Sequence, residues 1–427
     1  MAQIIASMRD FNPWWEGKFK LEYKEREIYP KIKKFLDMPQ IIALTGLRRV
    51  GKTTIMLKIV EDWISSGFNP RNIFLFSFDD FKDNHINAVI EEYERVNNKK
   101  LSDEKFLFLF DEIQKVDNWQ EQVKVIYDIH KKNIKMIISG SESLFIFKKS
   151  KESLAGRIFE FKIDTLTFRE FIKFKGVTYG SPDLYRKEYA KLFEEFMLSG
   201  GFPELCGIDD KEKIKMYIKE GIRDKILYKD IPSLFKVGDI SALNSILESI
   251  TENPGQLIDI SNFSNENKMS RPTLANYLRY LEDSFLIKKI YNFSKNKRKV
   301  ERKLKKYYPA LISIDLLFNN DDLSKSKAFE NAIINQLKVN FFWRDPYKHE
   351  VDAILTENEI TPIEIKYGKI ETKGLSFFID KFKIKEGFII SKDEEGEIKA
   401  DGRKIKIIPA WKWLLAMNSA RAGRGLV

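Results

Sequence analysis

The chain has 427 residues, which is too long for one hydrophobic core, so we expect several domains. A hydrophobic content of 43% with 32% charged residues is typical of a globular protein and excludes a disordered chain. The formal net charge of +11 favours a polyanionic partner, nucleic acid first, although a requirement for solubility would explain it equally well.

Several classes of protein are excluded by what the sequence lacks. Cys206 is the single cysteine and there are three histidines, which excludes an internal disulfide and a Cys/His zinc site. No apolar run approaches the roughly 18 residues that span a bilayer, and no signal peptide is visible at the start. We therefore expect a cytoplasmic protein with no membrane partner.

The first part of the chain alternates short apolar runs with amphipathic stretches, a pattern that predicts a parallel sheet flanked by helices. Phe106–Phe110 is apolar at every position, as expected of a strand that is covered on both faces. The expected strands are Ile41–Thr45, Asn72–Phe78, Phe106–Phe110, Lys135–Ser139 and Ile158–Ile163.

A glycine-rich segment after the first expected strand fits G-x-x-x-x-G-K-[ST] at every fixed position and leads into a helical pattern. This pattern predicts a P-loop, whose glycines let the backbone wrap around phosphate oxygens at the start of a helix. Lys52 would reach the β- and γ-phosphates of ATP, and Thr53 would ligate Mg²⁺. The predicted nucleotide-binding residues are Gly46, Leu47, Arg48, Arg49, Val50, Gly51, Lys52, Thr53 and Thr54.

Two adjacent carboxylates, Asp111 and Glu112, end the expected strand Phe106–Phe110. We expect Asp111 to hold Mg²⁺ through water and Glu112 to act as the catalytic group that polarises the attacking water. A protein that only held a nucleotide would not need Glu112, so this pair predicts hydrolysis.

Three further positions have a functional interpretation beside a structural one. Ser141 resembles the AAA+ residue that contacts the γ-phosphate or the lytic water, but it would also suit a polar turn. Arg157 could stabilise charge in the transition state, in its own subunit or in a neighbour's, or be a solvated arginine. Pro203 resembles a lid proline that packs near adenine in signalling ATPases, and a helix-breaking turn explains it equally well.

The middle of the chain contains a candidate DNA-binding unit. Asp239 and Ser270 are plausible N-caps of two helices, and a two-stranded wing is expected within Phe285–Phe293. Such a unit resembles a winged helix-turn-helix, whose last helix enters the major groove, and a basic run follows it. The alternative is an ordinary helical unit beside a charged linker. The predicted DNA contacts are Arg271, Thr273, Asn276, Arg279, Lys297, Arg298 and Lys299.

Near the C-terminus, two expected strands carry acidic residues and a lysine. Period two places Glu364 and Lys366 on one strand face, with Asp352 across a hairpin. Two carboxylates and a lysine can hold Mg²⁺ and activate water for phosphodiester hydrolysis. Glu330 falls in the apolar stripe of a helix, where a carboxylate needs a partner such as a metal or a lysine.

Taken together, these motifs resemble archaeal and bacterial AAA+-type ATPases that end in a restriction-endonuclease-like domain of the PD-(D/E)xK fold. The matching segments are GLRRVGKTT, LFLFDEIQKV, IISGSES, LAGRIFEF, GGFPEL, FENAIINQL, EVDAIL and PIEIKYG. The resemblance implies a metal role for Asp352 and Glu364, a supporting acidic role at the metal for Glu330, and a catalytic role for Lys366. It implies an α/β fold in five parts: a P-loop AAA+-type core (1–165), a helical lid (166–235), a winged helix-turn-helix with basic linker (236–306), a restriction-endonuclease-like α/β domain (307–418) and a tail (419–427).

The leading hypothesis is therefore an ATP-driven, DNA-binding protein whose nucleotide state orients the winged helix and a nuclease-like domain. One alternative is a signalling switch in which ATP controls a protein–protein interaction and the nuclease-like domain is inactive. Another is a nuclease that ATP regulates. ATP and Mg²⁺ are the expected cofactors, and the sequence leaves open whether the chain forms a homo-oligomer.

Overall fold

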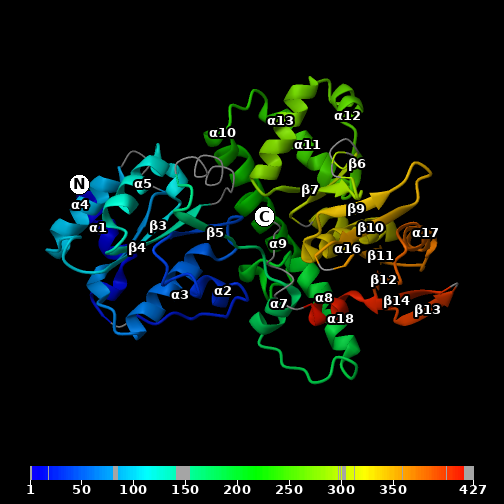
Figure 1. The fold of residues 1–427 in the computed structure, drawn as a ribbon, viewed down its shortest axis with the longest axis horizontal. Coiled ribbons are helices and arrows are strands. Elements are labelled where there is room, and N and C mark those ends of the chain that lie inside the picture. The colour runs from blue at the N-terminus through cyan, green and yellow to red at the C-terminus, as the bar shows by residue number, and fades with distance from the viewer. Residues whose placement is uncertain are drawn as a thin grey trace. The chain divides into compact units, whose positions relative to one another are not determined.

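The structure, a computed structural model, describes residues 2–17, 19–79, 85–140, 154–296, 298, 300, 304–311, 313–357, 359–400 and 402–417 (Figure 1). The chain forms two compact units, Met1–Thr165 and Leu166–Val427, which are described separately below. Among the described residues, no helix combines the length and apolar character needed to cross a membrane.

The first unit is built on a five-stranded sheet in the order β2-β3-β4-β1-β5, and every neighbouring pair is parallel. All the strands predicted for this region are present, and β3 is buried along its whole length as expected. The strands are β1 (Ile41–Thr45), β2 (Ile73–Ser77), β3 (Phe106–Asp111), β4 (Ile134–Gly140) and β5 (Ile158–Lys162). Because all strands run the same way, the segments that follow β1, β3 and β4 meet at one edge of the sheet.

Helices cover this sheet, and Figure 1 shows α1, α4 and α5 on one side of it with α2 and α3 on the other. Their bounds are α1 (Ala2–Phe11), α2 (Tyr29–Lys33), α3 (Lys52–Ser65), α4 (Ile86–Asn97) and α5 (Trp119–His130).

The N-terminal segment also protects the edge strand β2. The indoles of Trp14 and Trp15 donate to the carbonyl of Ile73 at 3.1 and 2.9 Å, and the Asn12 side chain bonds both backbone groups of Leu75. These contacts satisfy edge groups that would otherwise invite pairing with another chain.

The second unit begins with helices, as the pattern from residue 166 to 235 predicts. These are α7 (Phe168–Phe174), α8 (Arg186–Ser199), α9 (Lys211–Ile218) and α10 (Ile231–Leu234), with two π-helical turns at Lys219–Arg223 and Ile226–Asp230. Three helices follow: α11 (Ile240–Glu252), α12 (Ile260–Glu266) and α13 (Arg271–Asp283). The predicted N-caps are confirmed, because Asp239 accepts from the N–H of Ala242 and Ser270 from that of Thr273.

A nine-stranded sheet completes this unit, in the order β13-β14-β12-β11-β10-β9-β7-β8-β6. Its strands are β6 (Gln256–Ile258), β7 (Ile287–Asn292), β8 (Lys305–Pro309), β9 (Phe341–Arg344), β10 (Glu350–Leu355), β11 (Thr361–Lys366), β12 (Glu386–Ser391), β13 (Gly396–Ala400) and β14 (Arg403–Pro409). The helices of this part are α15 (Ile314–Phe318), α16 (Asp322–Leu337), α17 (Lys373–Phe382) and α18 (Ala410–Ala416).

The expected wing differs from the observed one. Phe285–Phe293 contains one strand, β7, and not two, and its antiparallel partner is β8. The basic run that was predicted as a linker therefore connects two strands and ends inside β8, so the expected boundary between residues 306 and 307 falls within a strand. The reason is packing: Tyr307 and Tyr308 are buried, and β7 also pairs with β9, which joins the strands beside α11–α13 to the C-terminal sheet.

Candidate active site

The loop between β1 and α3 has the backbone geometry that phosphate binding requires. Gly46 and Gly51 have φ values of 142° and 95°, and Gly51 is the N-cap of α3. A Cβ atom at Gly46 would lie 2.1 Å from the carbonyl oxygen of Ile163, so a larger residue cannot fit there. The loop therefore presents the start of α3, where backbone N–H groups and the helix dipole favour an anion.

Lys52 is held inside this loop and is 6% exposed. Its ammonium donates to the carbonyl oxygens of Gly46 and Leu47 at 3.1 and 2.9 Å. Both acceptors are neutral carbonyl oxygens, and hydrogen bonds from the ammonium to anionic phosphate oxygens would be stronger. When a nucleoside triphosphate binds, Lys52 is thus placed to exchange these carbonyl acceptors for phosphate oxygens.

Asp111 lies at the carboxyl end of β3 and is fixed by donors from three elements. The Thr53 hydroxyl donates to Oδ2 at 2.7 Å, and the backbone N–H of Glu112 donates to Oδ1 at 3.2 Å. The Ser139 hydroxyl, from the end of β4, also donates to Oδ1. A hydroxyl and a carboxylate side by side are oxygen ligands of the kind that Mg²⁺ takes beside nucleotide phosphates, so Thr53 and Asp111 fit the predicted metal.

Glu112 adopts a left-handed backbone conformation, with φ of 54°. Such a conformation is costly for a residue with a side chain and is often found at functional sites. The Gln114 amide donates to Glu112 Oε2 at 2.6 Å. Burial raises the pKa of Glu112, Lys52 opposes this shift, and Asp111 adds to it. A fixed, poorly solvated carboxylate beside the phosphate loop is suited to accept a proton from water.

The sequence also predicts roles at this site for Ser141 and Arg157. Ser141 lies outside the described residues, whereas Ser139, two positions earlier, contacts Asp111. Arg157 precedes β5 at the amino end of the sheet, because Ile41 of β1 pairs with Ile158. The length of β1, about 13 Å, therefore separates it from the P-loop. The guanidinium of Arg157 pairs with Asp128 at 2.9 and 3.1 Å, and its role in stabilising transition-state charge stays a prediction.

The adenine contact predicted for Pro203 stays a prediction. Pro203 belongs to the second unit, where it begins a short 3-10 helix, Pro203–Leu205, directly after the turn at Gly200 and Gly201. Gly200 is in the left-handed conformation and ends α8, so the helix-breaking interpretation is present in the structure.

The predicted acidic residues of the second unit do come together. Asp352 on β10 accepts from the N–H of Ile365 on β11 at 2.8 Å, and Lys366 pairs with Glu364 at 2.8 Å. From α16, Glu330 accepts from the Tyr308 hydroxyl at 2.7 Å. The helix and the hairpin therefore bring Glu330, Asp352, Glu364 and Lys366 into one buried cluster, which we call the acidic cluster.

Sequence reasoning missed two members of the acidic cluster, Lys306 and Glu350. The Lys306 ammonium lies 2.5 Å from Glu350 Oε1, 3.8 Å from Glu330 Oε1 and 3.8 Å from Asp352 Oδ1. The alternation of charged residues along 297–306 hid this lysine among surface residues. Only the tertiary structure shows that β8 turns Lys306 inward, where it is 4% exposed.

The carboxylates of the acidic cluster affect one another's protonation. Burial raises the pKa of Glu330 to about 7 and that of Glu364 to about 8, and in both cases Asp352 adds to the effect. Burial by itself lowers the pKa of Lys306, but Glu330, Asp352 and Glu350 outweigh it, so its pKa is raised. Lys306 is thus a permanent cation among these carboxylates.

This arrangement does not fit the metal ligands predicted at Glu330, Asp352 and Glu364. Over the part of the chain that the structure describes, no group of three or more His, Cys, Asp or Glu side chains could hold a metal ion. The physical reason is that the lysine ammonium already lies among the carboxylates that a divalent cation would need.

Comparison with known proteins identifies the family. Residues 38–172 match a model described as an AAA domain, and residues 190–310 and 325–413 match two domains of unknown function, DUF8612 and DUF4143. The chain is 30% identical over 412 residues to the uncharacterized protein MJ1544 of Methanocaldococcus jannaschii, with 88% of each covered. The chain belongs to this family of AAA-domain ATPases.

Two further relatives and one solved structure are also similar to this chain. MJ1637 of the same archaeon is 26% identical over 426 residues, covering 91% of this chain and 87% of the relative. A protein of Haemophilus influenzae is 31% identical over 262 residues, with 60% and 63% covered. A solved structure, the Saccharomyces cerevisiae Hsp104–ADP complex, matches 78% of this chain and 45% of its own, with 12% identity and a TM-score of 0.31.

In this AAA-domain protein, a buried arginine that the sequence did not single out holds the P-loop. Arg26 is 5% exposed, and its guanidinium donates to the carbonyls of Val50 at 2.6 Å and Asp164 at 2.7 Å. It thereby ties the loop to the segment that follows β5. Arg26 stands in the charged run KERE and has no local signal that distinguishes it from its charged neighbours.

Replacing Arg26 with alanine is expected to raise the KM for ATP by about ten-fold or more, because a hydrogen bond from a charged donor contributes about 1.5–3 kcal/mol and the loop carbonyl would lose its partner. The check is the ATP dependence of phosphate release. Lys20→Ala, which removes an exposed cation of the same segment, is the control and should leave KM unchanged. Equal KM values for wild type and Arg26→Ala would contradict the positioning role.

The exposed face of α13 carries three of the seven DNA contacts predicted for this AAA-domain protein. Arg271, Asn276 and Arg279 are exposed, whereas the Thr273 hydroxyl lies 2.8 Å from that of Ser270 and forms part of the N-cap. Arg298 lies in the connection between β7 and β8, and Lys297 and Lys299 lie outside the described residues.

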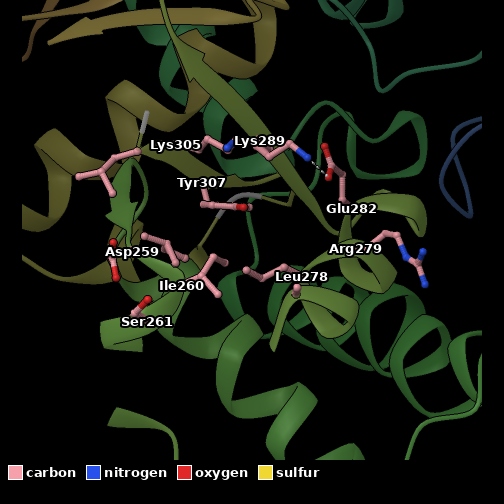
Figure 2. Close-up of a pocket in the computed structure, with 12 residues that line it drawn as sticks. Asp259, Ile260, Ser261, Leu278, Arg279, Glu282, Lys289, Lys305 and Tyr307 are labelled. Atoms are coloured by element: carbon pink, nitrogen blue, oxygen red, sulfur yellow. Dashed lines mark hydrogen bonds and ion pairs between the residues drawn. The ribbon is translucent and has the colours of Figure 1, made fainter. Parts of the chain in front are cut away.

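A cavity of about 430 Å³ lies beside α13, between α12 and strands β7 and β8 (Figure 2). Its lining includes Arg279, Lys305 and Tyr307, and the ion pair of Lys289 with Glu282 at 2.7 Å. The α13 surface and the β7–β8 hairpin therefore border one hollow with several basic side chains.

Proposed function

We propose that the protein binds Mg²⁺-ATP at the P-loop, hydrolyses it, and uses this cycle to control binding of DNA by the second unit. The observation that carries the ATPase part is the arrangement of Lys52, Thr53, Asp111 and Glu112 at the carboxyl ends of β1 and β3. Membership of an AAA-domain family supports it independently.

The residues divide the work of hydrolysis. The loop and Lys52 bind the phosphates, and Thr53 and Asp111 would hold Mg²⁺, which supplies neutralisation of phosphate charge when bound. Ser139 and the N–H of Glu112 keep Asp111 oriented. Glu112, held by Gln114, orients and deprotonates the attacking water.

DNA binding is supported by the form of the middle segment. Helices α11, α12 and α13 pack beside the antiparallel strands β6, β8 and β7, an arrangement that resembles a winged helix-turn-helix with β7 and β8 as the strands of the wing. On α13, Leu274, Leu278 and Leu281 are buried, which leaves the side with Arg271 and Arg279 to solvent. An exposed helix face with two arginines suits insertion into a major groove.

The double variant Arg271→Ala/Arg279→Ala is expected to weaken duplex DNA binding and to lower the slope of log K against log salt by about 1.8, since each neutralised phosphate contributes about 0.9. Fluorescence anisotropy over a range of salt concentrations measures this slope. Lys219→Ala removes an exposed cation from the helical region and is the matched control. An unchanged slope in the double variant would rule out α13 as the DNA-binding element.

The competing function is a nucleotide-dependent switch that controls a protein–protein interaction, with an inactive nuclease-like domain. One observation favours it, namely the lysine among the carboxylates of the acidic cluster. ATP hydrolysis measured without DNA and with duplex, single-stranded and branched DNA separates the two proposals. Stimulation by any DNA supports the first, and indifference to every DNA supports the switch.

A further inference from the structure

The acidic cluster is assembled from four elements of the second unit. β8 contributes Lys306 and Tyr308, α16 contributes Glu330, β10 contributes Glu350 and Asp352, and β11 contributes Glu364 and Lys366. Glu330, Glu350 and Asp352 share Lys306 as a partner, and Glu364 interacts electrostatically with Asp352 and Lys306. Buried carboxylates need a nearby positive charge, which either a metal ion or a basic side chain can supply.

In the acidic cluster this positive charge comes from Lys306. One ammonium lies within 4 Å of carboxylate oxygens from Glu330, Glu350 and Asp352, which belong to two different elements. Lys306 cannot easily leave, because β8 is an interior strand paired with β6 on one side and β7 on the other. The cation is therefore fixed by the backbone of the sheet.

The remaining oxygens of the cluster are mostly committed to protein donors. Asp352 Oδ2 accepts from the N–H of Ile365, Glu330 Oε1 accepts from Tyr308, and Glu364 Oε1 binds Lys366. Glu364 Oε2 is buried and has no hydrogen-bond partner among the described residues. Each of the four carboxylates therefore has at least one oxygen in contact with a protein donor or cation, and a divalent cation at this place would also face the Lys306 ammonium.

We infer that Lys306 takes the place of a divalent cation in the acidic cluster, so that the C-terminal domain holds no catalytic metal and does not cleave DNA. Lys306 also has a structural role: it lies on β8, beside α11–α13, and its charge stabilises the buried carboxylates of α16 and β10. This inference is independent of DNA binding by α13, which could succeed or fail without changing it.

The test is Mn²⁺ binding to the nucleotide-free full chain. Binding is measured as the loss of the electron paramagnetic resonance signal of free Mn²⁺. Wild type and Asp352→Asn are expected to give the same isotherm, because the cluster binds no Mn²⁺ in either; any ion held near Thr53 and Asp111 is common to both. Lys306→Met is expected to bind about one additional Mn²⁺ per chain, and Lys306→Met/Asp352→Asn is expected to lose it again.

Two results would overturn the inference. The first is a wild-type Mn²⁺ site that Asp352→Asn removes, a comparison that stands even if Lys306→Met does not fold. The second is a folded Lys306→Met variant, judged by retained ATP hydrolysis and a cooperative thermal transition, that gains no Mn²⁺. In parallel, supercoiled DNA with Mg²⁺ should stay intact with wild type, and cleavage that Lys366→Ala abolishes would equally contradict the inference.

Discussion

Replacing Lys52 with alanine is expected to reduce ATP hydrolysis by about 10²–10³-fold or more, the loss typical of removing one group that stabilises transition-state charge. The ammonium is 6% exposed and donates to the loop carbonyls of Gly46 and Leu47, so it lies within the phosphate loop. ATP affinity should fall as well, because Lys52 contacts phosphates in both the ground state and the transition state. Phosphate release and binding of a fluorescent ATP analogue measure the two effects.

Lys58→Ala is the matched control for this experiment. Lys58 lies on the same helix, α3, but pairs with Glu61 at 2.7 Å and Asp62 at 2.9 Å and does not face the loop. Surface pairs of this kind contribute little to stability, so the control should keep wild-type hydrolysis. If Lys52→Ala hydrolysed ATP as fast as Lys58→Ala, the P-loop would not be the hydrolytic site.

Glu112→Gln is expected to lower kcat for ATP hydrolysis by about 10²–10⁴-fold, the range that a positioned general base contributes, while ATP binding is retained. Glutamine has nearly the same shape, but it cannot accept a proton from water. The variant should therefore accumulate bound, uncleaved ATP, which would also make it useful for trapping the ATP state. Single-turnover hydrolysis together with equilibrium ATP binding separates the loss of chemistry from a loss of affinity.

The control for Glu112→Gln is Asp117→Asn, which neutralises an exposed carboxylate a few residues later. It should leave both kcat and ATP affinity unchanged. Weak binding together with slow hydrolysis in Glu112→Gln would instead mean that Glu112 acts by shaping the loop, since its left-handed backbone lies next to Asp111. Full activity of the variant would exclude it as the base.

Together the site and the acidic cluster suggest a division of labour between the two units. The first unit has the fixed carboxylates and the phosphate loop that hydrolysis needs. The second unit has a helix, α13, with two exposed arginines, and a cluster whose charge Lys306 already neutralises in part. We therefore expect chemistry on ATP in one unit and recognition without cleavage in the other.

The sequence by itself determined the features that depend on neighbours along the chain. Alternating apolar runs gave the five strands of the first sheet, and the phosphate loop followed from the spacing of Gly46, Gly51 and Lys52. The caps Asp239 and Ser270 were also readable, because an N-cap bonds to a backbone N–H only two or three residues later. Such signals need no knowledge of the rest of the fold.

Only the tertiary structure decided which distant residues meet. Arg26 donates to a carbonyl 24 residues away, Ser139 on β4 contacts Asp111 on the neighbouring strand β3, and β7 pairs with β8 and β9. Lys306 shows the physical reason most clearly. A lysine in a charged run is indistinguishable from its neighbours until sheet pairing turns it inward, where burial and the nearby carboxylates make it the central cation of a site.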